Sequence, residues 1–141
     1  MITIRPIRPE ETYPLRHEVL WPDKPFAYVM LAEDADGYHF GAFRENELLA
    51  VISLFEKDGI ARFRKFATRP DAQRQGIGSH LLNQVIDKAR QLGADKLWCD
   101  ARLSAAAFYQ RFGMEPEGEV FFKDEIPYAK YVLPLSNSPT V

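Results

Sequence analysis

Cysteine is almost absent from this chain, since Cys99 is the only one among 141 residues. A single cysteine cannot form an intrachain disulfide, which fits a reducing compartment. No run approaches the ~18 consecutive apolar residues that a membrane-spanning helix requires. The opening segment, Met1–Pro6, lacks the basic region and apolar run of a signal peptide. These absences predict a cytoplasmic protein that contacts no membrane.

The chain also has no large surplus of basic or acidic residues. The chain carries 18 basic and 20 acidic residues, for a formal net charge of −2, whereas proteins that bind nucleic acid usually have a basic surplus. The histidines His17, His39 and His80 do not stand at metal-ligand spacing from the cysteine or the acidic residues. We therefore expect neither a nucleic-acid partner nor a metal ion.

What the chain does have is the length and apolar content of one globular domain. Hydrophobic residues make up 46% of it, and a chain of this length buries a core without disulfides or metals. We expect a single domain over residues 1–135. Residues 136–141 are polar, offer nothing to bury, and are predicted to be a flexible tail.

Apolar alternation predicts strands in the first half of the chain. Ile2–Ile7 alternates as a half-buried strand does, and Pro9 then opens a helix that ends at Trp21. A second short helix or loop is expected over Phe26–Leu31. Short turn-like connectors separate three further strands, which we expect to form an antiparallel meander: Tyr38–Phe43, Leu48–Phe55 and Ile60–Ala67.

The second half of the chain begins with a segment of helical periodicity. An apolar face begins at Ile77 and ends before Gly93, which stands where a C-cap belongs. The elements expected after it are a strand over Lys96–Asp100, a helix over Ala105–Phe112 capped by Ser104, and strands over Val120–Phe122 and Tyr128–Leu133. The strand–helix–strand unit at residues 60–100 implies one parallel pair in a mostly antiparallel sheet. That layout is an α+β (mixed α/β) fold.

A glycine-bearing loop joins the strand at Ile60–Ala67 to the long helix. It reads Gln73-Arg74-Gln75-Gly76-Ile77-Gly78-Ser79. Such a loop places unpaired backbone N–H groups and the positive end of the helix dipole around one point, which suits a phosphate. A tight turn without any ligand is the alternative. The third glycine of a dinucleotide loop and the lysine of a triphosphate loop are both absent.

The loop and one later segment resemble a known family. Gln73-x-x-Gly76-x-Gly78 is similar to the Q/R-x-x-G-x-G/A signature of the GNAT superfamily of acyl-CoA-dependent N-acyltransferases. The segment Ala107–Met114 resembles that family's A-x-x-F-Y-x-x-x-G-F region. The resemblance covers Ile2 to Leu135 and is closest to small bacterial single-domain members. It implies a mostly antiparallel central sheet whose one parallel strand pair is splayed around the cofactor, with helices on both faces.

The resemblance also implies an activity and a set of site residues. Acetyl-CoA would donate an acetyl group to a primary amine of a small molecule or an exposed protein amine. Tyr109 would be the general acid. The pyrophosphate of coenzyme A would lie against the signature that begins at Gln73, on Arg74, Gln75, Gly76, Ile77, Gly78 and Ser79. The backbone of Phe66, Ala67 and Thr68 would pair with the pantetheine arm and supply an oxyanion donor. Members are often monomers or homodimers.

The chain departs from the family pattern because it lacks an acidic residue in the strand before the loop. Many members carry a glutamate in the strand before the loop, but Ile60–Phe66 has none. The candidate bases elsewhere are Glu33, Asp100 and His39, although Asp100 could instead pair with Arg102. The family often has asparagine at the position that Arg102 occupies here. Cys99 is expected to pack as a small buried hydrophobe.

Further alternatives stay open. Arg62, Arg64 and Lys65 either bind an anionic part of the acceptor or form a solvated face. A non-catalytic acyl-CoA-binding module would keep the loop and lose turnover. A generic nucleotide-binding domain would prefer ATP or NAD to coenzyme A.

Overall fold

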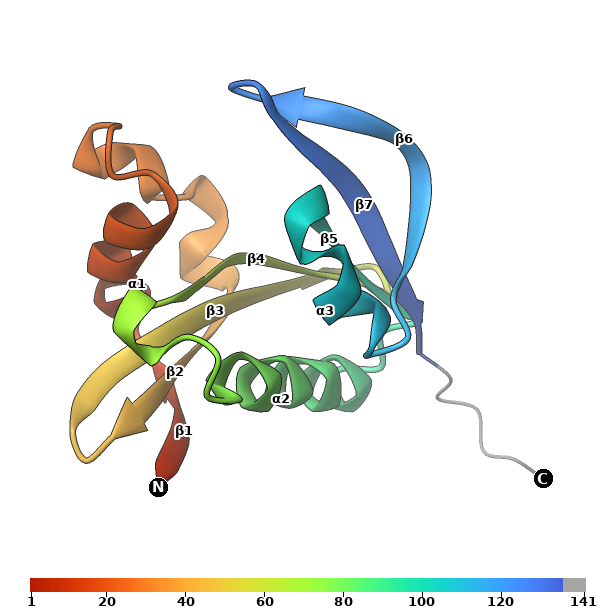
Figure 1. Ribbon diagram of the computed structural model, residues 1–141. Coiled ribbons are helices and arrows are strands. Elements are labelled where there is room, and N and C mark those ends of the chain that lie inside the picture. Colours follow the sequence, from red (N-terminus) through yellow and green to blue (C-terminus); the bar gives the residue numbers. More distant parts are fainter. Residues whose placement is uncertain (136–141) are drawn as a thin grey trace. The chain divides into compact units, whose positions relative to one another are not determined.

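Seven strands follow the sheet order β1-β2-β3-β4-β5-β7-β6 in a computed structural model that describes residues 1–135 (Figure 1). The chain divides into two units. The first comprises Met1–Phe55 and Phe63–Lys88, and the second comprises Glu56–Arg62 and the residues from Ala89 onward. Strand β4 (Ile60–Thr68) contributes residues to both. The single domain over residues 1–135 stays a prediction, and the tail expected at residues 136–141 lies outside the described residues.

The first unit is built on β1 (Ile2–Ile7), β2 (Tyr38–Arg44) and β3 (Glu47–Lys57), which pair antiparallel in that order. The middle of β3 is buried throughout, because apolar residues there follow one another without alternation. Helix α1 (Pro9–Leu15) places Leu15 against Val51 and Ala67. Helix α2 (Ile77–Gln91) buries the apolar face that its sequence predicts.

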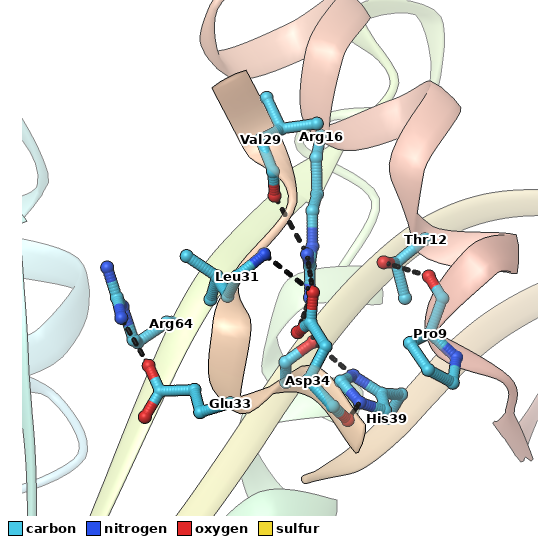
Figure 2. A network of polar contacts seen from close by, with 10 residues as sticks. Pro9, Thr12, Arg16, Val29, Leu31, Glu33, Asp34, His39 and Arg64 are labelled. Atoms are coloured by element: carbon cyan, nitrogen blue, oxygen red, sulfur yellow. Dashed lines mark hydrogen bonds and ion pairs between the residues drawn. The ribbon is translucent and has the colours of Figure 1, made fainter. Parts of the chain in front are cut away.

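A buried arginine holds the N-terminal helical segments to β3. Arg16 opens a π-helical turn, η1 (Arg16–Leu20), and its side chain is fully buried. Its guanidinium donates to both carboxylate oxygens of Asp34, at 2.8 Å each, and to the Val29 carbonyl at 2.9 Å. It also donates to the Ser53 hydroxyl of β3 at 3.0 Å. Figure 2 shows Arg16 between Val29 and Asp34. The two partners on helical segments lie in the 3₁₀ turns η2 (Phe26–Val29) and η3 (Ala32–Asp36).

His39 completes this buried network. Its Nε2 lies 2.8 Å from the Asp34 carbonyl, and its Nδ1 lies 2.7 Å from the Ser53 hydroxyl. Because a carbonyl only accepts, Nε2 carries the proton and Nδ1 accepts from Ser53. Burial acts to raise the pKa of Asp34. The hydrogen bonds from Arg16 and from the Leu31 N–H outweigh it and hold that pKa below its ordinary value.

The second unit joins the start of β4 to β5 (Lys96–Arg102), β7 (Ile126–Pro134) and β6 (Glu115–Lys123). The β4–β5 pair is parallel, as expected, over the register Ile60↔Lys96 to Arg62↔Trp98. β5 pairs antiparallel with β7, and β7 with β6, in a long hairpin (Figure 1). Both strands of this hairpin are longer than predicted, because pairing with β7 extends β6 through polar residues that show no apolar alternation.

Helix α3 is shorter than the predicted helix over Ala105–Phe112. It spans Ala106–Gln110 and follows a 3₁₀ turn, η5 (Leu103–Ala105). Ser104 lies inside that turn and does not cap the helix, so the expected cap is wrong. The sequence pattern does not distinguish a 3₁₀ entry from the first turn of an α-helix.

The Arg16–Asp34 pair predicts a large stability difference between two arginine variants. Replacing Arg16 with methionine leaves Asp34 buried and unpaired, and the expected loss in the free energy of unfolding is about 3–5 kcal/mol. The matched control is Arg8→Met, because Arg8 pairs with Glu11 at 3.1 Å on the surface. Its loss should stay below about 1 kcal/mol. Urea unfolding at pH 7 measures both, and equal losses would contradict the role assigned to Arg16.

Candidate functional site

The turn after β4 is fixed by ion pairs. The Arg69 N–H donates to the Leu49 carbonyl at 2.9 Å, and this hydrogen bond holds the turn to β3. The Arg69 guanidinium contacts Glu47 at 3.0 Å and Asp71 at 2.6 Å. Its hydrogen bonds hold the pKa of Asp71 below the ordinary value. The 3₁₀ turn η4 (Pro70–Ala72) follows, with Ala72 buried, so the loop starts from a rigid base.

Two glutamine side chains shape the rest of the loop. The Gln73 side-chain amide donates to the Thr68 carbonyl at 3.1 Å, and that of Gln75 donates to the Asp71 carbonyl at 3.2 Å. Arg44 donates to the Gln75 side-chain oxygen at 2.7 Å. The side chains of this signature thus hold the backbone of the loop in place.

Backbone N–H groups at the start of α2 are left without acceptors. The His80 N–H donates to the Gly76 carbonyl, so Gly76 is the last residue before the helix. Within residues 1–135, no hydrogen bond is donated by the N–H groups from Arg74 to Ser79. Unpaired donors at a helix N-terminus, together with the helix dipole, suit a phosphate group.

Gly76 is required for its backbone conformation. Its φ is +81°, in the left-handed region, and Arg74 is also there at +64°. A Cβ on Gly76 would meet no atom within 4 Å. The space beside the free N–H groups is therefore open, and the loop fits an anionic group such as a pyrophosphate.

The strand before the loop carries a feature that the sequence analysis missed. Lys65, in the middle of β4, has a φ of +56°, a left-handed conformation that departs from the extended strand. No glycine or asparagine signals it. The parallel register with β5 ends at Arg62, before the predicted pantetheine-binding residues. Of these, Ala67 is buried against Leu15 and Val51.

Tyr109 lies in α3 of the second unit and is buried. Its ring centroid is 5.1 Å from that of Phe108 and 6.1 Å from that of Tyr131. Burial, with a smaller contribution from Cys99, raises the pKa of the Tyr109 phenol above its ordinary value. The phenol is therefore protonated at neutral pH.

The three candidate bases are all engaged. Glu33 pairs with Arg64, and both ring nitrogens of the buried His39 are bonded. Asp100 pairs with Arg62 at 3.0 Å, so the alternative pairing with Arg102 is wrong. Arg62 is opposite Trp98 in the β4–β5 register and stacks on that ring, which brings its guanidinium to Asp100. The Arg102 Nε lies 3.4 Å from the Tyr128 hydroxyl.

Residues 1–135 hold no group of three or more histidines, cysteines or acidic residues placed to bind a metal ion. None of the helices in the same range has both the length and the apolar character to cross a membrane.

Comparisons with known proteins bear on this loop and this fold. The model of the acetyltransferase (GNAT) family matches residues 5–114. The chain belongs to that family, whose members are acyl-CoA-dependent acetyltransferases. The fold class and the enzyme class expected from the sequence are both confirmed.

Individual relatives support the same assignment. The uncharacterized N-acetyltransferase YitI of Bacillus subtilis (strain 168) is 29% identical over 130 residues, covering 86% of this chain and 87% of YitI. The ribosomal protein bS18-alanine N-acetyltransferase of Escherichia coli (strain K12) is 30% identical over 102 residues, covering 69% of this chain and 66% of that protein.

Among solved structures, a GNAT family acetyltransferase from Elizabethkingia anophelis with acetyl-CoA bound has the same fold. Its TM-score is 0.74 at 23% identity, with 95% of this chain and 98% of that chain covered. The acceptor, the role of Tyr109 and the individual cofactor-binding residues stay predictions.

The buried position of Cys99 predicts that its thiol is alkylated slowly. The thiol is buried in β5, and burial raises its pKa. Because the thiolate is the reactive form, the folded protein should react with iodoacetamide at pH 8 at least about tenfold more slowly than the unfolded chain. Mass spectrometry of timed samples, with and without urea, measures both rates. Fast labelling of the folded protein would contradict the packing role.

Proposed function

We propose that this protein transfers an acetyl group from acetyl-CoA to a primary amine, with the loop before α2 binding the pyrophosphate of coenzyme A. The observation that carries the proposal is the run of unpaired N–H groups from Arg74 to Ser79 beside the open space at Gly76. A pyrophosphate would accept from these donors. The exposed Arg74 and Arg44 would add positive charge.

In this proposal β4 positions the thioester. The backbone of Phe66, Ala67 and Thr68 pairs with the pantetheine arm, and one N–H donates to the thioester oxygen as negative charge develops there. The left-handed φ of Lys65 and the end of the parallel register at Arg62 support this assignment.

The chemistry requires two proton movements. The neutral amine attacks the thioester carbonyl carbon, a C–N bond forms, and the C–S bond breaks so that coenzyme A leaves as a thiolate. We assign Tyr109 as the donor of a proton to the sulfur, after which solvent reprotonates the phenolate. The phenol carries its proton at neutral pH, as an acid must. In this proposal the amine loses its own proton to water.

The acceptor belongs to one of two classes, a small-molecule amine or an exposed protein amine. One relative is named for acetylating an alanine of ribosomal protein bS18, which supports including polypeptide N-termini. Their α-amine, with a pKa of about 7.7–8.0, loses a proton more easily than a lysine side chain does. We further propose that the protein acts in the cytoplasm as a monomer or homodimer, without nucleic acid.

A matched glycine pair tests the loop. Gly76 and Gly93 have nearly equal φ values, +81° and +80°, and a Cβ at either would meet nothing within 4 Å. Alanine should therefore cost each a similar amount of stability, roughly 1–2 kcal/mol. Only Gly76→Ala should weaken acetyl-CoA binding, by at least about tenfold, because its methyl group enters the phosphate space.

Calorimetric titration of both variants with acetyl-CoA measures the difference, with ATP and NAD as control ligands. Equal affinities in the two variants would contradict the loop assignment. A preference for ATP or NAD would favour the generic nucleotide-binding alternative.

The phenol of Tyr109 is tested by Tyr109→Phe. As a general acid, Tyr109 should contribute about 100-fold or more to kcat, while acetyl-CoA affinity stays unchanged. Tyr131→Phe is the control, because it removes a hydroxyl from an equally buried tyrosine of the same unit. Thiol release measures turnover across a panel of amines. An unchanged kcat in Tyr109→Phe would refute the acid role, and no turnover by the wild type would favour the non-catalytic acyl-CoA-binding module.

A further inference from the structure

Glu33 supplies the carboxylate that β4 lacks. Its side chain pairs with Arg64 of β4, although the two residues are 31 positions apart in the sequence. Figure 2 shows the two side chains meeting, with Glu33 reaching out from η3. Both belong to the first unit. An acidic group is thus held against the strand by tertiary contact.

The position of Glu33 is set by the buried network. Its neighbour Asp34 is bonded to Arg16 and to the Leu31 N–H, and the Asp34 carbonyl accepts from His39. These bonds hold η3 on both sides of Glu33. The Glu33 side chain itself stays 45% exposed, so a ligand can reach it.

Glu33 also has unused hydrogen-bonding capacity. Arg64 engages Oε1, and within residues 1–135 no donor contacts Oε2. A carboxylate oxygen that is accessible and not yet bonded is a suitable acceptor for an ammonium group.

The place of this pair along β4 gives it a functional meaning. Arg64 precedes Phe66, the first residue assigned to the pantetheine arm, by two positions in β4. The Glu33–Arg64 pair is therefore held on the strand to which the proposed function assigns the thioester.

We propose that the Glu33 carboxylate, held against β4 by Arg64, binds the ammonium group of the acceptor amine. This inference rests on the proposed function and names the residue that selects a cationic acceptor. Glu33 neutralises Arg64 and offers Oε2 to the ammonium. Without Glu33, the uncompensated Arg64 repels the same cation.

The test uses ligand pairs that differ in charge but hardly in shape. Protein saturated with coenzyme A is titrated by NMR at pH 6.5 with L-alaninamide, whose α-amine is protonated there, and with lactamide, which carries a hydroxyl instead. n-Butylammonium and 1-butanol form a second pair. The wild type should bind each ammonium ligand more tightly than its alcohol.

The variants separate charge from structure. Glu33→Gln should weaken ammonium binding at least about tenfold and leave alcohol binding unchanged. Glu33→Asp should retain most of the preference. The double variant Glu33→Gln with Arg64→Gln should recover part of the loss, because the repelling charge is gone. Glu117→Gln, which removes the charge of a glutamate paired with Lys130 at 3.3 Å in the second unit, is the control and should change nothing.

Each outcome decides the inference. No ammonium preference in the wild type, or an unchanged preference in Glu33→Gln, overturns it. Loss of alcohol and ammonium binding together in Glu33→Gln also overturns it, because that result indicates a structural role. Acetyl-CoA affinity measured on the same samples reports on the proposed function separately: a wild type that binds acetyl-CoA without preferring ammonium leaves the proposed function standing.

Discussion

A guanidinium group removed from water constrains the first unit of this protein. Arg16 is fully buried, and a buried charge is tolerated only when an opposite charge and further hydrogen bonds surround it. Asp34, Val29 and Ser53 meet that need from three separate elements. The network therefore requires η1, η2, η3 and β3 to be in place together. It also fixes the segment that carries Glu33, so a buried ion pair determines where an exposed carboxylate stands.

The loop before α2 divides its work between side chains and backbone. The polar side chains of the loop interact within the protein. Arg69 forms an ion pair, and the amides of Gln73 and Gln75 donate hydrogen bonds to backbone carbonyls of the loop. The backbone N–H groups that follow donate no hydrogen bond within residues 1–135, and the proposed function assigns them to the pyrophosphate. Because any residue except proline supplies such a donor, only the glycine at Gly76 is demanded by conformation.

The proposed catalysis works by positioning the reactants. Asp100 and His39 are held by partners, and Glu33 pairs with Arg64 through one oxygen. Tyr109 is protonated and buried, so it can donate but cannot accept a proton at neutral pH. Rate enhancement of this kind comes from holding amine and thioester together and from stabilising developing charge. An acceptor that loses its proton easily suits such a site.

The sequence by itself determined the element order, the parallel pair and the family, because these depend on local periodicity and on a short contiguous signature. The ends of the helices and strands depend on tertiary contacts. The 3₁₀ turn before α3 and the extended β6–β7 hairpin are examples. Only the tertiary structure decided which charges meet. Arg62 pairs with Asp100 and Arg64 with Glu33 across 38 and 31 positions, and no glycine signals the left-handed φ of Lys65. Long-range partners are chosen by the packing of whole elements, and no local pattern encodes that choice.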